Sequence, residues 1–360
     1  MGYFCRMEQL LIVGGGLAGT ILAAETYSRG ISFRWMISNR INPASAAAYG
    51  MCNPVHIRNR VPAWKADELY ETSRSFFQYW QQQSVIPFFQ PMPIHHLVVD
   101  AEEFVQWRQN TESTSLWKYT LGEPQYHVTD QVKPGYSGSI LINESFFVAV
   151  PRFMDRIQQL LSVHIEWSDF DYPALEPQSN NWLYKGNTYT RIIFSEGYYG
   201  SRNPYFNQVP FNPCKGEMLE VDIPGLEMPT ALHKKIMLVP AGNGRFLCGA
   251  TYRWDELDDL PTASGRKELE EGLQEIIGNR YTYEVINHKA GVRPAMADRR
   301  PVTGWHPAIN GIGILNGFGS RGLMVGPAAA KNLLDHLEHG TPIWPDWDIA
   351  RFKKRLLKNL

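Results

Sequence analysis

The apolar residues nearest the start of the chain form a short continuous run, which is typical of a buried strand. Residues 9–13 make up this run, three glycines follow at the spacing G-x-G-x-x-G, and residues 20–24 begin a helical pattern. The pattern predicts a strand, a tight turn and a helix whose N-terminal N–H groups favour an anion. Gly14 would permit the tight turn, Gly16 would let a pyrophosphate approach the backbone, and Gly19 would let helix and strand pack closely.

This turn predicts a dinucleotide site, although glycine turns between strands and helices also occur for packing reasons alone. Its position directly after the first predicted strand favours the dinucleotide interpretation. The residues expected to contact the dinucleotide here are Gly14, Gly15, Gly16, Leu17, Ala18 and Gly19.

The next segment, residues 31–38, alternates between apolar and polar positions and is predicted to be the second strand of a βαβ unit. A dinucleotide fold usually has an acidic residue near the end of this strand, where it binds the adenosine ribose hydroxyls. Neutral residues occupy these positions here. The ribose contact is therefore expected from Ser38 or Asn39, from Arg40, or not at all.

Residues 42–54 are unusually rich in small side chains, which suits a backbone that lies against a flat ligand, and Ala48, Gly50 and Met51 are the expected contacts. Residues 64–83 follow with the apolar spacing of a long helix. Between Pro87 and Phe147 the pattern is one of strands and loops, which predicts an inserted, mostly antiparallel domain.

The second half of the chain returns to alternating helices and strands. A hairpin is predicted around Gly186 and Asn187, and its second strand ends at residues 195–197, where Glu196 and Gly197 are expected near the cofactor. The other predicted elements are helices at 153–163 and 269–277 and strands at 163–167 and 313–315.

A second glycine cluster, residues 317–322, separates the last predicted strand from a predicted helix at 326–339. Two such turns suit a cofactor with a pyrophosphate at one end and a flat ring at the other, and FAD has this shape. The positive end of the last helix would then face the part of the flavin where negative charge collects on reduction. An ordinary strand-turn-helix is the alternative. The expected contacts are Gly317, Gly319, Ser320, Arg321, Gly322 and Leu323.

Length and composition predict about two domains in a globular protein, because the chain has 360 residues, 44% of them hydrophobic and 20% charged. Without a linker or repeat, the domains are expected to be interleaved. The net charge of -1 gives no indication of nucleic-acid binding. Residues 351–358 form a basic, amphipathic tail that suits either a membrane surface or, more commonly, a solvated terminal helix.

The four cysteines show neither a C-x-x-C pair nor metal-ligand spacing, so a reducing compartment and no metal site are expected. The apolar start of the chain is interrupted by glycines, unlike a signal peptide, and no run of eighteen apolar residues occurs. A cytoplasmic location without a membrane span is the expectation.

Five fragments along nearly the whole chain resemble the D-amino-acid oxidase family of FAD-dependent oxidoreductases, and within it the glycine-oxidase-like branch. The fragments are LLIVGGGLAG at 10–19, KGE at 215–217, GRFLCGAT at 244–251, AGVRP at 290–294 with DRRPVTG at 298–304, and NGFGSRGLMVGPA at 316–328.

The resemblance implies an α/β fold, in which a glutathione-reductase-like, Rossmann-type FAD-binding domain carries an inserted, mainly antiparallel α+β substrate domain. The expected ranges are 7–86, 148–210 and 290–360 for the FAD-binding domain, and 87–147 and 211–289 for the substrate domain.

The family's reaction is hydride transfer from the carbon that bears an amine to flavin N5, which gives an imine that hydrolyses. Arg293 matches the carboxylate-binding arginine of the family and would pair bidentately with an amino-acid carboxylate, close to the flavin. Tyr252 matches a pocket-lining position, and Arg321 would lie near the flavin or the substrate. The alternative for Arg293 is an ordinary ion pair, for Tyr252 a place in the core, and for Arg321 a backbone-capping role. Cys52 and His56 lie near the small-residue stretch, and some relatives attach FAD covalently through such residues.

The sequence thus predicts an FAD-dependent oxidase or dehydrogenase that acts on the C–N bond of a small amine or amino acid, with oxygen or another electron acceptor. Oxidation of a 2-hydroxy acid, a role in tRNA modification and a flavin-binding protein without turnover are the alternatives. The substrate, its stereochemistry and the oligomeric state stay open.

Overall fold

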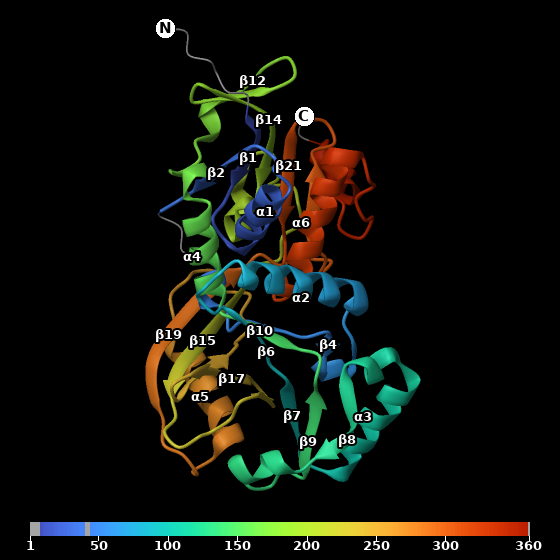
Figure 1. Cartoon of the computed structure of the whole chain (residues 1–360), viewed down its shortest axis with the longest axis vertical. Helices are drawn as coiled ribbons and strands as arrows, with labels where there is room; N and C mark the ends of the chain where they lie inside the picture. The colour runs from blue at the N-terminus through green and yellow to red at the C-terminus, as the bar shows by residue number, and fades with distance from the viewer. Residues whose placement is uncertain (1–7, 40–43, 359–360) are drawn as a thin grey trace. The chain divides into compact units, whose positions relative to one another are not determined.

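The computed structural model describes residues 8–39 and 44–358. The chain divides into two compact units, and Figure 1 colours the chain by residue number. The first unit comprises Met1–Ser45, Pro151–Cys214 and Val292–Leu360, and the second comprises Ala46–Val150 and Lys215–Gly291. Each unit is therefore assembled from segments that are far apart in the sequence.

The first unit is built on a mixed sheet with the strand order β11-β2-β1-β14-β13-β12, to which β21 adds beside β14 and β20 beside β21. The strands from β11 to β14, and β21, run parallel, whereas β12, β13 and β20 pair antiparallel. Their bounds are β1 Glu8–Val13, β2 Phe33–Ile37, β11 Ile165–Trp167, β12 Leu175–Pro177, β13 Trp182–Tyr184, β14 Asn187–Phe194, β20 Val302–Trp305 and β21 Ile312–Asn316.

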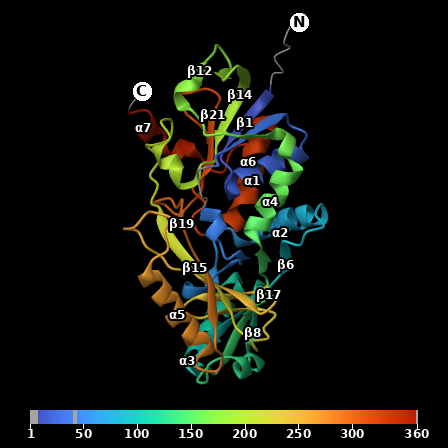
Figure 2. The same cartoon turned by 90° about the vertical axis from the view of Figure 1, so that its left-hand side faces the viewer.

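Helices α1 (Leu17–Ser28), α4 (Val150–Leu160, from Pro151 onward) and α6 (Gly322–His339) belong to this unit, and Figures 1 and 2 label all three. Helices α1 and α6 pack side by side. Gly326 permits this approach, since a Cβ there would lie 2.7 Å from Cδ1 of Ile21. Helix α6 begins at Gly322, four residues before the expected start, because its first turns hold glycines and Pro327 that hide a helical pattern.

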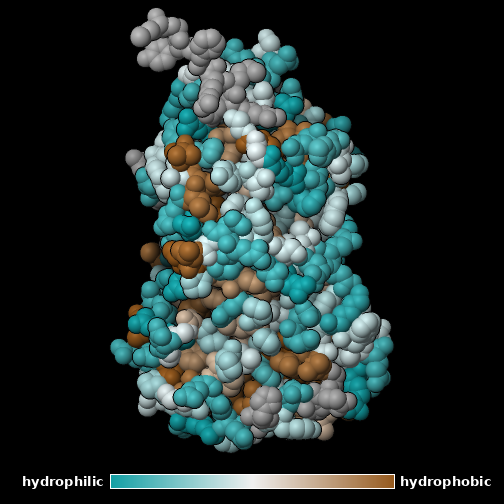
Figure 3. Space-filling view, viewed as in Figure 1, coloured by the Kyte–Doolittle hydropathy of each residue, from teal (hydrophilic) through white to brown (hydrophobic). Residues whose placement is uncertain are grey.

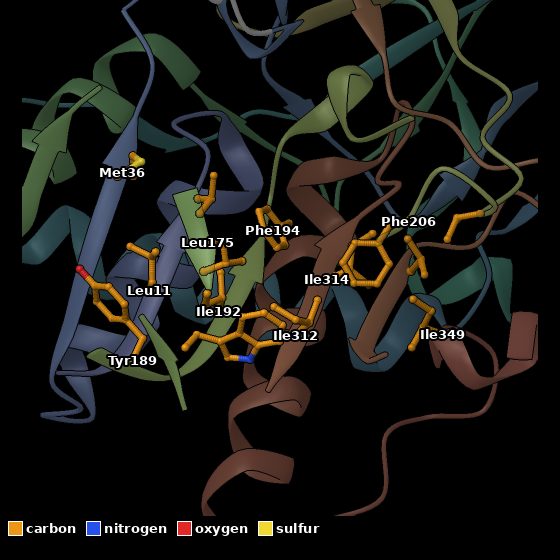
Figure 4. Packing of buried hydrophobic residues seen from close by; sticks show 14 of the residues in the cluster. Leu11, Met36, Leu175, Tyr189, Ile192, Phe194, Phe206, Ile312, Ile314 and Ile349 are labelled. Carbon is orange, nitrogen blue, oxygen red and sulfur yellow. The ribbon is translucent and has the colours of Figure 1, made fainter. Parts of the chain in front are cut away.

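Figure 4 shows the core of the first unit, where Leu11 of β1, Ile192 of β14 and Ile312 of β21 lie among aromatic residues. The basic tail contributes to the same cluster through the short helices η8 (Ile349–Phe352) and α7 (Lys353–Leu356), since Ile349 and Leu356 are both buried. The apolar side of the tail is therefore used for packing, which favours a terminal helix with solvated basic residues over a membrane anchor.

The second unit is built on an eight-stranded sheet with the order β19-β15-β18-β17-β16-β7-β9-β8. The pairs β15·β18, β18·β17, β17·β16, β7·β9 and β9·β8 are antiparallel, and the pair β16·β7 is parallel. The bounds are β7 Ile94–Val98, β8 Thr120–Gln125, β9 Gly138–Ile142, β15 Cys214–Asp222, β16 Ala231–His233, β17 Met237–Gly242, β18 Arg245–Gly249 and β19 Glu284–Arg293.

Helix α5 (Ala263–Ile277) packs on this sheet through Leu269, Leu273 and Ile276, which are fully buried, and α3 (Ala101–Ser113) also belongs to this unit. The small sheet β3-β10-β6 and the pair β4·β5 complete the strands. Their bounds are β3 Met51–Cys52, β4 Val55–His56, β5 Val61–Pro62, β6 Phe89–Pro91 and β10 Phe146–Val148.

Residues 46–86 group with the second unit, which differs from the expected ranges, where they belong to the FAD-binding domain. Two contacts explain the difference. Strand β3 pairs antiparallel with β10, and helix α2 (Ala66–Gln82) packs its Tyr70 and Phe77 rings against Phe146 of β10. The local sequence pattern does not show these long-range contacts, and the expected place of residues 46–86 in the FAD-binding domain stays a prediction.

The face of the molecule in Figure 3 is mostly hydrophilic, with apolar residues in scattered groups. Among the helices of the described residues, none combines the length and the apolarity needed to cross a bilayer.

Candidate active site

The first glycine turn follows β1 and needs glycine at two positions for steric reasons. Gly14 has φ +123°, donates its N–H to the carbonyl of Met36 at 2.9 Å, and would place a Cβ only 2.2 Å from the carbonyl oxygen of Ser195. A Cβ on Gly19 would lie 1.9 Å from the carbonyl oxygen of Gly14. The positive φ of Gly14 agrees with the tight turn predicted for it, and the close contact of Gly19 with Gly14 agrees with the predicted close packing. The contacts of both glycines with a cofactor stay predictions.

A buried tryptophan of β2 holds this turn by a side-chain hydrogen bond. The indole Nε1 of Trp35, on the fully buried part of β2, donates to the carbonyl oxygen of Gly14 at 2.8 Å. Gly15 lies against the end of the same strand, since a Cβ there would be 2.4 Å from Cγ2 of Ile37. The turn is thus fixed between β1, β2 and β14.

The N-terminus of α1 suits the pyrophosphate of a dinucleotide. Its first turn, including Leu17 and Ala18, lies wholly in the described range and carries no acidic residue, and the N-cap Gly16 makes no side-chain hydrogen bond. The N–H of Leu17, the first residue of the helix, donates to Oγ of Ser45 at 3.0 Å. Ser45 lies in the small-residue stretch, but it was not singled out in advance.

Ser195 adds a second polar group beside this turn. Its side chain is buried at the end of β14, and its hydroxyl has no hydrogen-bond partner within the part of the chain that the structure describes. A buried hydroxyl without a partner is costly unless a bound group satisfies it. The turn and the helix N-terminus together suit the pyrophosphate of a dinucleotide.

The end of β2 lacks an acid in sequence but has one nearby in space. Ser38 donates its hydroxyl to Oδ1 of Asp169 at 2.5 Å, and Asp169 follows the neighbouring parallel strand β11. Asn39 is exposed, and Arg40 lies outside the described residues.

Glu196, which follows β14, has both carboxylate oxygens hydrogen-bonded by protein donors. The hydroxyl of Tyr172 donates to Oε1 at 2.5 Å, and Nδ2 of Asn203 donates to Oε2 at 2.7 Å. Burial raises the pKa of Glu196, although these two hydrogen bonds act in the opposite direction. The carboxyl therefore has a structural role, and its predicted contact with the cofactor stays a prediction.

Asn316, at the end of β21, connects the turn at Gly197 with the second glycine turn. Its Nδ2 donates to the carbonyl of Gly197 at 2.9 Å, and its Oδ1 accepts the N–H of Gly317 at 2.8 Å. Gly197 and Gly317 both have positive φ, +60° and +76°, which explains why glycine occupies them. Asn316 was part of the family-like fragment but had no predicted role.

The second glycine turn packs against the segment that follows β19. A Cβ on Gly317 would lie 2.6 Å from Cγ of Met296, and the N–H of Gly319 donates to the carbonyl of Pro294 at 3.3 Å. Ser320 is exposed and Arg321 is half-buried as the N-cap of α6. The first turn of α6, which includes Gly322 and Leu323 and is fully described, carries no acidic residue. This helix N-terminus is electrostatically suited to a group that becomes negatively charged.

Arg293, the last residue of β19, directly precedes the segment that touches this turn. Its side chain is half-buried, and Nη1 lies 3.9 Å from Sγ of Cys214. The structure thus brings Arg293 and the second glycine turn into one part of the first unit, through Pro294 and Gly319.

The remaining predicted residues belong to the second unit. Tyr252 is 44% exposed and stacks on Trp254, with ring centroids 6.3 Å apart, so the alternative of a core tyrosine is wrong. Gly50 has φ +81°, and a Cβ there would lie 2.2 Å from the carbonyl of Val148. Pairing with the strand β10 therefore explains Gly50 without a ligand. Ala48 and Met51 are half-buried beside it.

Two groups of the family-like KGE fragment are also buried. The Lys215 side chain is fully inaccessible, and its ammonium group pairs with the carboxylate of Asp258 at 2.5 Å. Glu217 accepts hydrogen bonds from the N–H and the hydroxyl of Thr262, and its Oε2 lies 2.8 Å from Nε2 of His288.

A family model described as DAO, FAD dependent oxidoreductase, matches residues 9–336. A glycine oxidase from Pseudomonas aeruginosa is 21% identical over 358 residues, which cover 93% of this chain and 96% of the relative. A solved glycine oxidase from Geobacillus kaustophilus has a TM-score of 0.78 at 19% identity, over 98% of this chain and 99% of that one.

An iminodiacetate oxidase from Chelativorans sp. BNC1 has a TM-score of 0.77 at 20% identity, over 93% of this chain and 96% of that one. These structures share the fold of this chain, a Rossmann-type FAD domain with a substrate domain. The family match extends over most of the sequence, from the first glycine turn into the helix that follows the second. The chain therefore belongs to the DAO family of FAD-dependent oxidoreductases, and its cofactor is FAD.

Proposed function

We propose that the protein oxidises the C–N bond of a small amine or amino acid, and that Arg293 binds the carboxylate of this substrate. The position of Arg293 carries the proposal. It ends β19 directly before Pro294, whose carbonyl is hydrogen-bonded by Gly319 of the second glycine turn. A guanidinium offers two parallel donors that match the geometry of a carboxylate.

Bound FAD supplies the acceptor for the hydride that leaves the carbon next to nitrogen. Arg293 would fix the substrate by its carboxylate, so that this carbon is held in one orientation. Arg321, as the N-cap of α6, would add a positive charge where the flavin becomes negatively charged. Tyr252, with its exposed ring stacked on Trp254, would offer an aromatic wall to the substrate.

The relatives support an amino carboxylate as the substrate class. Glycine and iminodiacetate, the compounds in the names of the similar oxidases, both carry a nitrogen one carbon away from a carboxylate. In this proposal the predicted glycine contacts of the first unit hold FAD, and Arg293, in the same unit, binds the substrate carboxylate.

The test of the reaction is anaerobic addition of candidate substrates to the purified FAD-loaded protein, followed by its visible spectrum. Glycine, sarcosine, iminodiacetate, proline and a panel of D-amino acids represent the C–N class, and lactate and related 2-hydroxy acids represent the C–O class. We expect bleaching of the flavin band by a member of the first class. Bleaching by hydroxy acids alone would move the activity to a C–O bond, and a flavin band that no compound bleaches would indicate a protein without turnover.

The test of the residue is a comparison of Arg293→Ala and Arg293→Lys with Arg245→Ala, a control at an exposed arginine of the second unit. Loss of a charge-assisted pair predicts a KM for the carboxylate substrate about 10- to 100-fold higher in Arg293→Ala, with the flavin content unchanged. Arg293→Lys keeps the charge but not the bidentate geometry, so an intermediate KM is expected. Equal KM values in Arg293→Ala and the control would show that Arg293 does not bind the substrate carboxylate.

A further inference from the structure

The expected ribose-binding acid is missing from the end of β2, yet the structure places a carboxylate beside that position. Ser38, the residue after β2, donates its hydroxyl to Oδ1 of Asp169 at 2.5 Å. The two residues are 131 positions apart in the sequence, so no local pattern connects them. Only the pairing of the strands brings them together.

The strand β11 delivers Asp169 to this place. It pairs in parallel with β2, with Trp167 opposite Ile37, and the next N–H, that of Ser168, donates to the carbonyl of Ile37 at 3.0 Å. Parallel strands in register end at the same edge of a sheet. Asp169 therefore stands beyond the carboxyl end of β11 as Ser38 stands beyond that of β2.

The same edge holds the glycine turn. The N–H of Gly14 donates to the carbonyl of Met36, and Gly15 lies against the side chain of Ile37. In dinucleotide-binding folds the pyrophosphate lies on this turn and the adenosine ribose lies at the end of the second strand, where a carboxylate accepts its hydroxyls. Ser38 occupies that position without a carboxylate of its own.

We propose that Asp169, supported by Ser38, binds the adenosine ribose hydroxyls of FAD in this protein. An ionised carboxylate only accepts hydrogen bonds and has about four lone-pair sites, so it accepts from Ser38 and from ribose hydroxyls together. The side chain of Asp169 is exposed and that of Ser38 is half-buried. The carboxylate that usually stands at the end of the second strand is thus supplied here by a residue that follows the neighbouring strand β11. This inference rests on FAD as the cofactor and not on the substrate proposed above.

The test is a titration of the apoprotein with FAD and, separately, with FMN, which lacks the adenosine. Asp169→Asn is compared with Asp171→Asn, which makes the same charge change at an exposed residue of the same loop. We expect Asp169→Asn to weaken FAD about 10- to 100-fold and to leave FMN unchanged, since one charge-assisted contact is lost. Asp171→Asn should bind FAD within about twofold of the wild type.

Two further measurements separate binding from folding. In the unaltered protein, an FAD analogue whose adenosine lacks the 2′-hydroxyl should bind more weakly, and in Asp169→Asn the same analogue should show little further loss, because the two changes remove one interaction. Ser38→Glu in the Asp169→Asn background should restore FAD affinity by returning the acid to the second strand. An Asp169→Asn variant that binds FAD like the wild type, or that loses FMN and FAD affinity equally, overturns the proposal.

Discussion

At the residue scale, the side chain of Trp35 fixes the first glycine turn through one hydrogen bond to the carbonyl oxygen of Gly14. Trp35 donates its indole N–H to this oxygen from a fully buried position on β2. Trp35→Phe keeps an aromatic ring but removes the donor, so we expect a loss of about 1–3 kcal/mol in the free energy of unfolding and weaker FAD binding. Urea unfolding of the apoprotein and an FAD titration measure both quantities.

The matched control is Trp117→Phe, at a tryptophan that is 64% exposed and belongs to the second unit. It should leave the unfolding midpoint and FAD binding close to those of the wild type. Equal losses in the two variants would show that the indole hydrogen bond contributes nothing beyond the general effect of a smaller ring.

A second prediction at this scale concerns a histidine pair in the second unit. Nδ1 of His96 and Nδ1 of His233 lie 2.9 Å apart, and Glu103 lies 3.0 Å from the other ring nitrogen of His96. Burial, with smaller contributions from His96 and Lys234, lowers the pKa of His233 from 6.5 to about 3. Below pH 6.5, His233 is therefore protonated in the unfolded chain but stays neutral in the folded chain. The free energy of unfolding should fall as the pH decreases towards 3.

The measurement is the denaturant midpoint at pH 7.5 and pH 5, in the wild type and in His233→Gln. The variant should be less stable at pH 7.5, because the contact with His96 is altered, but should lose less stability than the wild type between the two pH values. His339→Gln, at an exposed histidine of α6, should retain the wild-type pH dependence. If His233→Gln shows the same pH dependence of stability as the wild type, His233 is not a source of that dependence.

The contrast between predictable and unpredictable residues follows from the range of the interactions involved. Gly14 and Gly19 are recognisable because they belong to a recurrent strand-turn-helix motif, although the Cβ that Gly14 lacks would meet Ser195, far away in the sequence. Trp35 and Asp169 act across strand pairs, and their partners are separated by 21 and 131 positions. The sequence shows that no acidic residue stands at the end of β2. It does not show that Asp169, which follows β11, lies beside this position.

At the scale of elements, a buried carboxylate from one strand organises the start of a helix. Glu217 of β15 accepts the N–H and the hydroxyl of Thr262, and the hydroxyl of Thr262 in turn accepts the N–H of Gly265 in the first turn of α5. Gly265 is required because a Cβ there would lie 2.4 Å from the carboxylate. The helix N-terminus is thus capped through a residue 45 positions away.

Glu217→Ala should destabilise the protein by about 2–3 kcal/mol, because buried donors lose their acceptor, and Glu217→Gln should cost less, because its carbonyl still accepts one hydrogen bond. Urea unfolding monitored by circular dichroism gives the values. Glu271→Ala, at an exposed position of the same helix, should change stability by no more than about 0.5 kcal/mol. A similar loss in Glu217→Ala and Glu271→Ala would leave the capping role without support.

Elements were predictable where the local pattern was strong. The hairpin of β13 and β14 appears where Gly186 and Asn187 predicted it, and the strand at 313–315 is part of β21. Helix α4 is displaced by three residues from its expected start, and α6 begins four residues early. Tertiary packing of α6 on α1 stabilises a glycine-rich helical turn that intrinsic propensity disfavours.

At the scale of the whole molecule, the chain passes between the two units four times, after Ser45, Val150, Cys214 and Gly291. Strands β15 and β19 and helix α4 extend across these boundaries, so each of them has residues in both units. Unfolding of either unit must therefore break an element that the other unit shares. We expect one cooperative thermal transition for the apoprotein, with equal calorimetric and van't Hoff enthalpies.

FAD should raise the midpoint temperature of this single transition, because a ligand that binds only the folded state stabilises that state by mass action. At a free FAD concentration of 100 times Kd the gain is about 2.7 kcal/mol, which corresponds to about 3–4 °C for a chain of this length. FMN at the same concentration should raise the transition less, since it cannot reach the adenosine end of the site. Two separate transitions, of which FAD shifts only one, would instead show that the units unfold independently despite their shared strands, and that the cofactor stabilises only the unit that carries the glycine turns.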